Sequence, residues 1–304
     1  MYFFYHECFY MFSKQNAYEV HAHRGARDLF PENTLPAFQA AWESGADCIE
    51  LDVQFTRDGA VVIHHNFEIH RDAWLHRAAN SKNSLLIHSL SITELQQLEY
   101  GLLSDPEFPH QQKRPGIAIP TLDELIDAII TAKHPHAQNI RLNIELKRDL
   151  RQPHLSLDPD HIVTKVLEVI RRRDFSHRVQ YASFDPDILT LMRKKAPQAI
   201  LACLFSEETL YFIKHHFGMP GFEFLLGFAK AHQINILCPD HQMLKDSSQI
   251  IKMHREGFQV LAWTVNDPKR WQQLYEMGVN GVITDTPRAM TSFINGLNSQ
   301  YLHP

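Results

Sequence analysis

Cysteine is scarce in this chain of 304 residues, and long apolar runs are missing from it. The four cysteines, Cys8, Cys48, Cys203 and Cys238, have neither the spacing of metal ligands nor that of a disulfide framework. Three of them lie inside apolar runs, where a reduced thiol packs as a small hydrophobic side chain. We therefore expect a reducing compartment, and assign the chain to the cytoplasm.

Other absences exclude further classes of protein. No apolar stretch is long enough to span a bilayer, and the aromatic N-terminus lacks the basic start of a signal peptide. We expect residues 1–17 to form a tail, with an aromatic contact to a membrane surface as the alternative. The formal net charge of −5 provides no basic surface, so no nucleic-acid partner is expected.

Short apolar runs alternate with segments that repeat apolar residues at three- and four-residue spacing. The runs predict strands at residues 19–23, 47–53, 141–147, 178–183, 199–205, 234–239, 259–265 and 281–285. Helices are expected at 34–44, 121–133, 160–173, 186–196, 246–257 and 267–278, with two short ones within 207–232. This α/β alternation favours a (β/α)8 TIM barrel. An open doubly wound sheet is the alternative, but no glycine-rich phosphate loop follows any strand.

Residues 66–120 interrupt the alternation. They contain one short helix signal, at 91–98, and a stretch rich in proline and glutamine from 105 to 120. We predict one barrel domain over residues 18–304, with a small subdomain inserted at about residues 66–120, after the second strand and its hairpin. An insertion at that point can cover a site and shape its specificity.

Polar residues that can act as acid, base or phosphate ligand follow the predicted strands. They occur in five motifs: His23-Arg24-Gly25, Pro31-Glu32-Asn33-Thr34, Glu50-Leu51-Asp52, His65-Asn66 and Glu145-Leu146-Lys147. In a TIM barrel, the working side chains lie where strands end and loops begin. We therefore expect these motifs to meet at one mouth of the barrel.

Glu50, Asp52 and Glu145 are the candidate metal ligands. Glu50 and Asp52 are two positions apart on a strand, so their side chains point the same way. With Glu145 they offer three hard oxygen ligands, which suit one Mg²⁺ or Ca²⁺ better than zinc. Three carboxylates that converge would repel one another without a cation. The alternative is that Glu50 and Asp52 simply face water at a strand end.

His23 and His65 are the candidates for proton transfer, because an imidazole exchanges protons near neutral pH. A hairpin is predicted at residues 56–59, Thr-Arg-Asp-Gly. With Asp-Gly as a two-residue loop, His65 lies opposite Asp52, while His64 points the other way. That register selects His65, and a bulge would reverse the choice.

Arg24 and Lys147 are fixed cations suited to holding phosphate oxygens. Salt bridges to Glu50 or Glu145 are their alternative role. Trp263 lies on the penultimate predicted strand, where it can stack against a carbon face of a ligand or serve as a core aromatic residue.

Together these motifs resemble the glycerophosphodiester phosphodiesterase family, from His23 to Pro287. The resemblance extends through the blocks at residues 49–53, 56–59, 144–147, 262–266 and 281–287. It implies a barrel with an inserted subdomain that hydrolyses small glycerophosphodiesters to sn-glycerol 3-phosphate and an alcohol. It also implies a cyclic phosphate intermediate and the following roles: metal ligands Glu50, Asp52 and Glu145, acid and base His23 and His65, phosphate contacts Arg24 and Lys147.

The chain departs from the family pattern at two places. The family usually has His-Asp where this chain has His65-Asn66, and often His-Pro where it has Cys238-Pro239. Aligning forward from residues 58–59 keeps His65 in the histidine position and places Arg71 where the family commonly has arginine. Two other functions stay open: a lysophospholipase D whose N-terminus or insertion contacts lipid, and a barrel that binds phosphodiesters without hydrolysing them.

Overall fold

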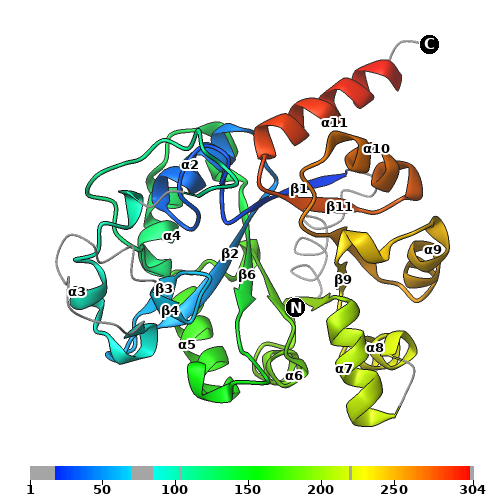
Figure 1. Cartoon of the computed structure of the whole chain (residues 1–304), viewed down its shortest axis with the longest axis horizontal. Coiled ribbons are helices and arrows are strands. Elements are labelled where there is room, and N and C mark those ends of the chain that lie inside the picture. Colours follow the sequence, from blue (N-terminus) through cyan, green and yellow to red (C-terminus); the bar gives the residue numbers. More distant parts are fainter. Residues whose placement is uncertain (1–17, 70–84, 103–104, 219–220, 302–304) are drawn as a thin grey trace.

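Figure 1 shows the computed structural model, which describes residues 18–69, 85–102, 105–218 and 221–301. The predicted tail at residues 1–17, Cys8 and the alignment of Arg71 lie outside the described residues.

Eight parallel strands in the described part of the chain close into a barrel. They are β1 (Glu19–His23), β2 (Cys48–Phe55), β6 (Arg141–Leu146), β7 (Val179–Ser183), β8 (Ile200–Phe205), β9 (Ile236–Pro239), β10 (Gln259–Ala262) and β11 (Gly281–Thr284). Each strand pairs in parallel with the next one in this order, and β11 pairs with β1 to close the ring. The predicted TIM barrel is confirmed, and the open sheet is excluded.

Helices follow the strands and surround the barrel (Figure 1). They are α2 (Leu35–Glu43), α4 (Leu122–Thr131), α5 (Pro159–Arg172), α6 (Pro186–Lys195), α7 (Glu207–Phe217), α8 (Gly221–Ala231), α9 (Ser247–Arg255), α10 (Pro268–Met277) and α11 (Pro287–Tyr301). Several begin where the sequence signals a start. Asp158, Asp185 and Asp267 each cap a helix whose first residue is proline, and Thr121 forms a capping box with Glu124.

Alternation along the strands separates two sets of side chains. Ile49, Leu51 and Val53 of β2 belong to the large core between strands and helices, so Glu50 and Asp52 point into the barrel. The interior beside β7 to β10 is apolar and contains Ala182, Ala202, Leu204, Ile236, Cys238 and Leu261. The interior beside β1, β2 and β6 is polar, and the candidate site lies at its carboxyl end.

The hairpin after β2 corrects one prediction. β3 (Val61–Ile63) pairs antiparallel with β2, and Phe55 lies opposite Val61. Three residues, 57–59, therefore form the loop instead of two, and the same register aligns Asp52 with His64 rather than His65. Gly59 takes a left-handed conformation, φ +84°, which is typical of three-residue hairpin loops. The predicted two-residue loop was therefore wrong, and so was the predicted pairing of Asp52 with His65.

The inserted segment has a small core of its own. Its described elements are β4 (Glu68–Ile69), β5 (Leu85–Leu86) and α3 (Ile92–Leu95), and β4 pairs antiparallel with β5. The core contains Val62, Ile69, Ile87, Leu90, Leu95, Leu98, Tyr100 and Ile119. The helix expected at 91–98 is present but shorter.

Short 3₁₀ turns also occur throughout the described chain. They are η2 (Ile87–Ser89), η3 (Tyr100–Leu102), η4 (Pro135–Gln138), η5 (Pro153–Leu155), η6 (Ser176–Arg178) and η7 (His241–Met243).

Two further observations concern the whole described chain. None of its helices combines the length and the apolar character needed to cross a membrane. Among the same residues, Cys48, Cys203 and Cys238 are buried and form no disulfide.

Candidate active site

Three carboxylates meet at the carboxyl end of β2 and β6. In the parallel pairing of these strands Asp52 lies beside Glu145, and Glu50 lies two positions earlier on the same face of β2. Glu50, Asp52 and Glu145 each offer an oxygen, and these oxygens all lie within 4.8 Å of one another. The structure thus brings together the three acids that the sequence singled out, in a barrel interior where only 1% of Asp52 is exposed.

Two cations partly balance this acidic cluster. Lys147 Nζ lies 3.0 Å from Glu145 Oε1 and 3.3 Å from Asp52 Oδ1. Arg24 Nε lies 3.3 Å from Asp52 Oδ2, and the Arg24 backbone N–H donates to Glu50 Oε2 at 3.0 Å. Burial alone would raise the pKa of Asp52, but Lys147 and Arg24 hold it well below its ordinary value.

The pKa values of the other two carboxylates, Glu50 and Glu145, are raised instead of lowered. Burial raises the pKa of Glu50 well above its ordinary value, and the charges of Asp52 and Glu145 raise it further. Burial also raises the pKa of Glu145, in spite of the nearby Lys147. Negative charge on this cluster is thus only partly compensated by the protein. A hard divalent cation fits the donor set, since all three ligands are carboxylate oxygens.

The loop between β1 and α2 places Arg24 beside the carboxylates. Arg24 and Asn33 both adopt positive φ, +54° and +55°, and the Asn33 backbone N–H donates to the Arg24 carbonyl at 2.9 Å. Asn33 Nδ2 also donates to Asp52 Oδ2 at 3.0 Å. Gly25 follows at φ +87°, and a Cβ there would lie 2.7 Å from the backbone of Ala37. The loop conformation therefore requires glycine at this position.

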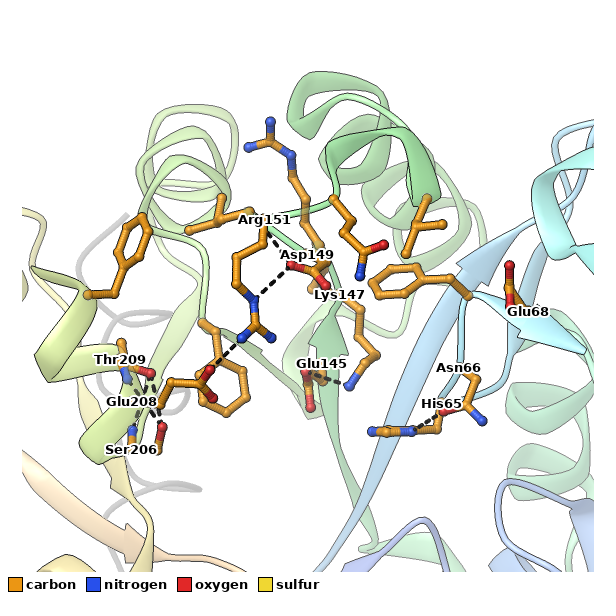
Figure 2. Close-up of a pocket in the computed structure, with 18 of the residues that line it drawn as sticks. His65, Asn66, Glu68, Glu145, Lys147, Asp149, Arg151, Ser206, Glu208 and Thr209 are labelled. Carbon is orange, nitrogen blue, oxygen red and sulfur yellow. Dashed lines mark hydrogen bonds and ion pairs between the residues drawn. The ribbon is translucent and has the colours of Figure 1, made fainter. Parts of the chain in front are cut away.

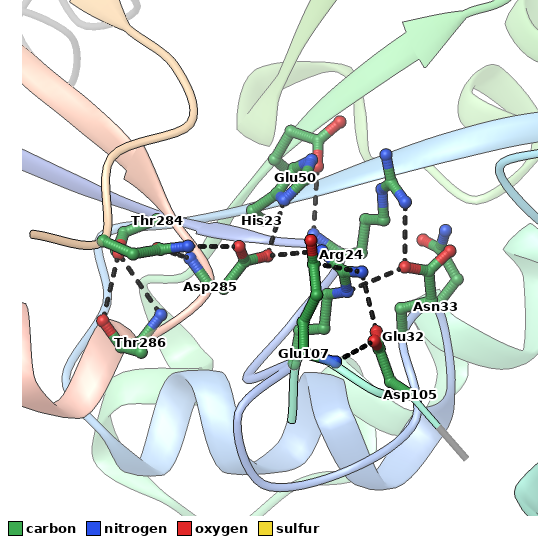
Figure 3. A network of polar contacts seen from close by, with 12 residues as sticks. His23, Arg24, Glu32, Asn33, Glu50, Asp105, Glu107, Thr284, Asp285 and Thr286 are labelled. Carbon is green, nitrogen blue, oxygen red and sulfur yellow. Dashed lines mark hydrogen bonds and ion pairs between the residues drawn. The ribbon is translucent and has the colours of Figure 1, made fainter. Parts of the chain in front are cut away.

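His23 is held by a carboxylate from the last strand (Figure 3). Its Nδ1 lies 2.7 Å from Asp285 Oδ1, and Asn266 Nδ2 donates to Asp285 Oδ2 at 2.6 Å. Burial would raise the pKa of Asp285, but the hydrogen bond with His23 and the contact with Asn266 lower it to about 2. An ionised Asp285 accepts the Nδ1 proton of His23, which leaves Nε2 for proton transfer.

Sequence reasoning missed Asp285 and Asn266. A signal was present within the family-like blocks, because Asp285 ends the predicted strand 281–285 and Asn266 directly follows the predicted strand 259–265. Glu32 belonged to a named motif but received no role. It binds the guanidinium of Arg24, with Nη1 2.8 Å from Glu32 Oε2.

His65 and His64 differ sharply in their surroundings. β3 ends at Ile63, and His65 then lines a cavity together with Glu145 and Lys147. His64 is buried, with its ring 5.5 Å from that of Tyr100 and its Nδ1 2.9 Å from the Asn66 carbonyl oxygen. The His64 backbone N–H still donates to the Asp52 carbonyl at 3.0 Å, and the chain bends from residue 65 on, so His65 no longer follows the register of the hairpin.

Asn66 contacts the imidazole of His65. His65 Nδ1 lies 2.8 Å from Asn66 Oδ1. Burial lowers the pKa of His65 to about 4. The charge of Asp52 opposes this shift in pKa, and the charge of Lys147 adds to it. A neutral His65 with Nδ1–H donated to the Asn66 amide oxygen has a free Nε2 lone pair, as a proton acceptor needs.

The cavity has a volume of about 610 Å³ and opens beside the acidic cluster (Figure 2). Glu145 and Lys147 form its barrel wall, and the segment 148–155 and α7 form its far side. His65 and the first residues of the insertion, 66–68, complete the lining. Trp263 and Phe184 line it with rings edge to face, 5.5 Å apart, and Trp263 Nε1 donates to the Cys238 carbonyl at 2.7 Å. Trp263 thus lies at the cavity, directly after β10, where it forms a single parallel β-bridge with Asp240.

Four predicted site residues are not part of the cavity wall: His23, Arg24, Glu50 and Asp52. Arg24, Glu50 and Asp52 connect to it through Lys147, which contacts both Asp52 and Glu145. Arg24, Glu50, Asp52, Glu145 and Lys147 thus form one continuous polar cluster, with the cavity on one side of it. His23 joins this cluster only indirectly, through Asp285, Arg27 and Glu32.

A closed (β/α)8 barrel with acidic, basic and imidazole side chains at the carboxyl ends of its strands is the arrangement of a TIM-barrel enzyme. The chain belongs to the glycerophosphoryl diester phosphodiesterase family, whose sequence model matches residues 23–289. The resemblance and the enzyme class predicted from the motifs are confirmed.

Individual relatives agree with this assignment. A glycerophosphodiester phosphodiesterase of Bacillus altitudinis is 29% identical over 271 residues, which cover 88% of this chain and 95% of the relative. The solved structure of a Silicibacter pomeroyi protein assigned to the same family is 27% identical, with a TM-score of 0.81 and coverage of 93% and 95%. The Oleispira antarctica phosphodiesterase, solved with its product sn-glycerol-3-phosphate, is 23% identical, with a TM-score of 0.67 and coverage of 91% and 96%.

Proposed function

We propose that the chain hydrolyses small glycerophosphodiesters to sn-glycerol 3-phosphate and an alcohol, with one Mg²⁺ or Ca²⁺ bound by Glu50, Asp52 and Glu145. The observation that carries this proposal is the convergence of these three carboxylates beside Arg24 and Lys147, next to a cavity. The sn-glycerol-3-phosphate held by the Oleispira antarctica protein supports the product.

The charged groups would act on the phosphate. A divalent cation held by the three acids would neutralise developing negative charge on a non-bridging phosphate oxygen. Lys147 and Arg24 already contact the carboxylate oxygens, and each has further N–H groups that can bind the remaining phosphate oxygens. Positive charge fixed in advance around the phosphate stabilises a transition state more than it stabilises the substrate.

The two imidazoles would carry the protons. In each ring Nδ1 is engaged, by Asp285 in His23 and by Asn66 in His65, so Nε2 is the exchanging atom. We propose that one Nε2 removes the proton of the neighbouring glycerol hydroxyl, which attacks phosphorus, while the other protonates the leaving alcohol. Water then opens the cyclic phosphate with the two roles exchanged.

The contact between Asn66 and His65 bears on the non-catalytic alternative. The change from the usual aspartate removes a charge, but the amide oxygen still accepts from the ring at 2.8 Å. The orientation of His65 therefore does not require a carboxylate. This contact favours an enzyme over a barrel that only binds its ligand.

A second candidate function is favoured by the cavity wall. Phe67, Leu150, Leu155, Phe212 and Trp263 give the cavity a largely apolar lining. Leu150, at its rim, is 40% exposed. An apolar wall beside a phosphodiester site suits the acyl chain of a lysophospholipid, which would make the protein a lysophospholipase D.

We also propose that residues 18–304 form one domain and that the segment 66–120 acts as its cap. Residues 66–68 line the cavity, which supports a role in substrate choice. The buried, unpaired state of Cys48, Cys203 and Cys238 supports a reducing compartment, the cytoplasm.

Product analysis tests the function directly. Purified protein would be incubated with glycerophosphocholine, glycerophosphoethanolamine, glycerophosphoglycerol and long-chain lysophosphatidylcholine, and the products would be followed by ³¹P NMR. We expect glycerol 3-phosphate from the water-soluble diesters, preceded by a transient cyclic phosphate. Exclusive turnover of the lysolipid would favour lysophospholipase D, and binding without any product would favour the non-catalytic barrel.

A further inference from the structure

Arg27 is surrounded by carboxylates from three parts of the chain. Among the described residues, its Nε lies 3.0 Å from Glu32 Oε2, and its Nη1 lies 3.5 Å from Asp285 Oδ1. Its Nη2 lies 2.7 Å from Asp105 Oδ2 and 3.2 Å from Glu107 Oε2. The side chain is 15% exposed, so these ion pairs are partly shielded from water.

Two of these carboxylates hold candidate active-site residues. Asp285 accepts the hydrogen bond that orients His23, and Glu32 Oε2 is bound by Arg24 Nη1 at 2.8 Å. Arg27 therefore touches neither His23 nor Arg24, yet it contacts the acidic partner of each. A planar guanidinium can do this because its five N–H groups point in fixed, divergent directions.

The other two carboxylates come from the inserted segment. We call residues 105–112 the strap, and Figure 3 shows its Asp105 and Glu107 beside the loop that follows β1. Gln111 Nε2 donates to the Arg27 carbonyl at 2.5 Å, and the Gln112 backbone N–H donates to the Leu29 carbonyl at 2.8 Å. The ring of Phe108 lies 5.1 Å from the Arg27 guanidinium carbon, within range of a cation–π contact.

We propose that Arg27 is a positioning residue that couples the strap to the orientation of His23 and Arg24. Without its guanidinium, the buried Asp285 and the partly exposed Glu32 lose a shared cation, and the strap loses its ionic attachment to the barrel. Partners that orient functional side chains typically change activity by about tenfold to a hundredfold when removed. This inference rests on the proposed phosphodiesterase activity of the same site.

Steady-state kinetics of Arg27→Gln would test the inference, with turnover of the best diester from the substrate panel as the readout. We expect kcat to fall by about tenfold to a hundredfold while KM changes far less, since binding groups remain. Arg27→Lys keeps the charge but loses the planar guanidinium with its several N–H donors, so its kcat should lie between those of Arg27→Gln and the wild type. Asp105→Asn leaves the site carboxylates intact and should also lower kcat, by loosening the strap.

The chain offers a matched control in Arg57. It too joins the barrel to the inserted segment, through Glu94 and the Ser89 carbonyl, but it is 61% exposed and contacts none of the candidate site residues. Arg57→Gln should keep the wild-type kcat. Circular dichroism and thermal unfolding of each variant would report the folded fraction.

The outcomes separate this inference from the proposed function. A wild-type protein inactive on every diester would refute the function itself. An active wild type with an equally active Arg27→Gln variant would overturn the positioning role. A kcat loss that only matches the loss of folded protein, with no recovery in Arg27→Lys, would overturn it as well.

Discussion

Nδ1 of His23 lies 2.7 Å from Oδ1 of Asp285, although the two residues are 262 positions apart in the chain. His23 ends the first barrel strand, and Asp285 directly follows the last one. The parallel pairing of β1 with β11 that closes the barrel brings them together. Closure of the barrel therefore also forms the pair of His23 with Asp285.

The role of Asp285 can be tested by replacing it with asparagine. The amide keeps the shape but loses the charge that fixes the tautomer and orientation of the His23 ring, so kcat should fall by about a hundredfold or more. Kinetics at saturating substrate, with thermal unfolding as a check on the fold, would measure this. A folded Asp285→Asn protein with wild-type kcat would show that His23 does not depend on the pair.

The two adjacent histidines should behave in opposite ways. His65→Ala should abolish turnover and leave the fold intact, because the ring lines the cavity. His64→Ala should keep turnover but lower the free energy of unfolding by about 1–3 kcal/mol, because a buried ring beside Tyr100 is removed. Kinetics and urea unfolding of both variants would decide. An inactive His64→Ala beside an active His65→Ala would reverse the assignment.

Glu19 makes stability depend on pH at the other end of the barrel. Burial would raise its pKa, but the hydrogen bond with His21 and the charge of Arg141 lower it from 4.5 to about 2. Since the folded pKa is depressed, the stabilisation is complete above pH 4.5 and is lost as pH falls toward 2. One pKa unit is worth about 1.4 kcal/mol, so up to about 3 kcal/mol is involved.

Urea unfolding between pH 7 and pH 3 would measure this contribution. Glu19→Gln should be less stable than the wild type at neutral pH, and the difference should shrink as the solution is acidified. If the free energy of unfolding changed equally with pH in the two proteins, Glu19 would not be a source of the pH dependence.

Gly25 and Gly59 form a matched pair for testing the β1–α2 loop. Both have positive φ, +87° and +84°, but only at Gly25 would a Cβ collide with Ala37, at 2.7 Å. Alanine at Gly59 should cost about 1–2 kcal/mol from its backbone conformation alone. Gly25→Ala should cost clearly more and should also lower kcat, since Arg24 is its neighbour. Equal losses of stability in thermal unfolding would argue against the steric explanation.

Much of the barrel was predictable because its signals are local. Apolar runs and helical spacing gave the order of the elements, and Glu50 and Asp52 share a face through strand periodicity alone. Helix α11 was missed, since Asn295 and Gly296 weaken its helix signal while the contact of Phe293 with Trp271, at 5.8 Å between rings, is tertiary.

The remaining errors and omissions depend on contacts across the chain. The predicted hairpin loop was one residue too short. In the three-residue loop, Asp58 accepts from the Thr56 hydroxyl and from the Ile92 backbone N–H in the insertion. The pairing of His23 with Asp285 and the contacts of Arg27 with the strap could not be derived from local patterns either. Each joins segments that only the closed barrel brings together.

The most direct measurement is the cation dependence of turnover. Protein treated with EDTA would be assayed for glycerol 3-phosphate release before and after addition of Mg²⁺ or Ca²⁺, alongside Glu145→Gln. We expect no activity after chelation and recovery with one of the cations. The variant should need about tenfold to a hundredfold more cation for half-maximal rate. Full activity in EDTA, or an unchanged cation requirement in Glu145→Gln, would contradict a metal site formed by these three carboxylates.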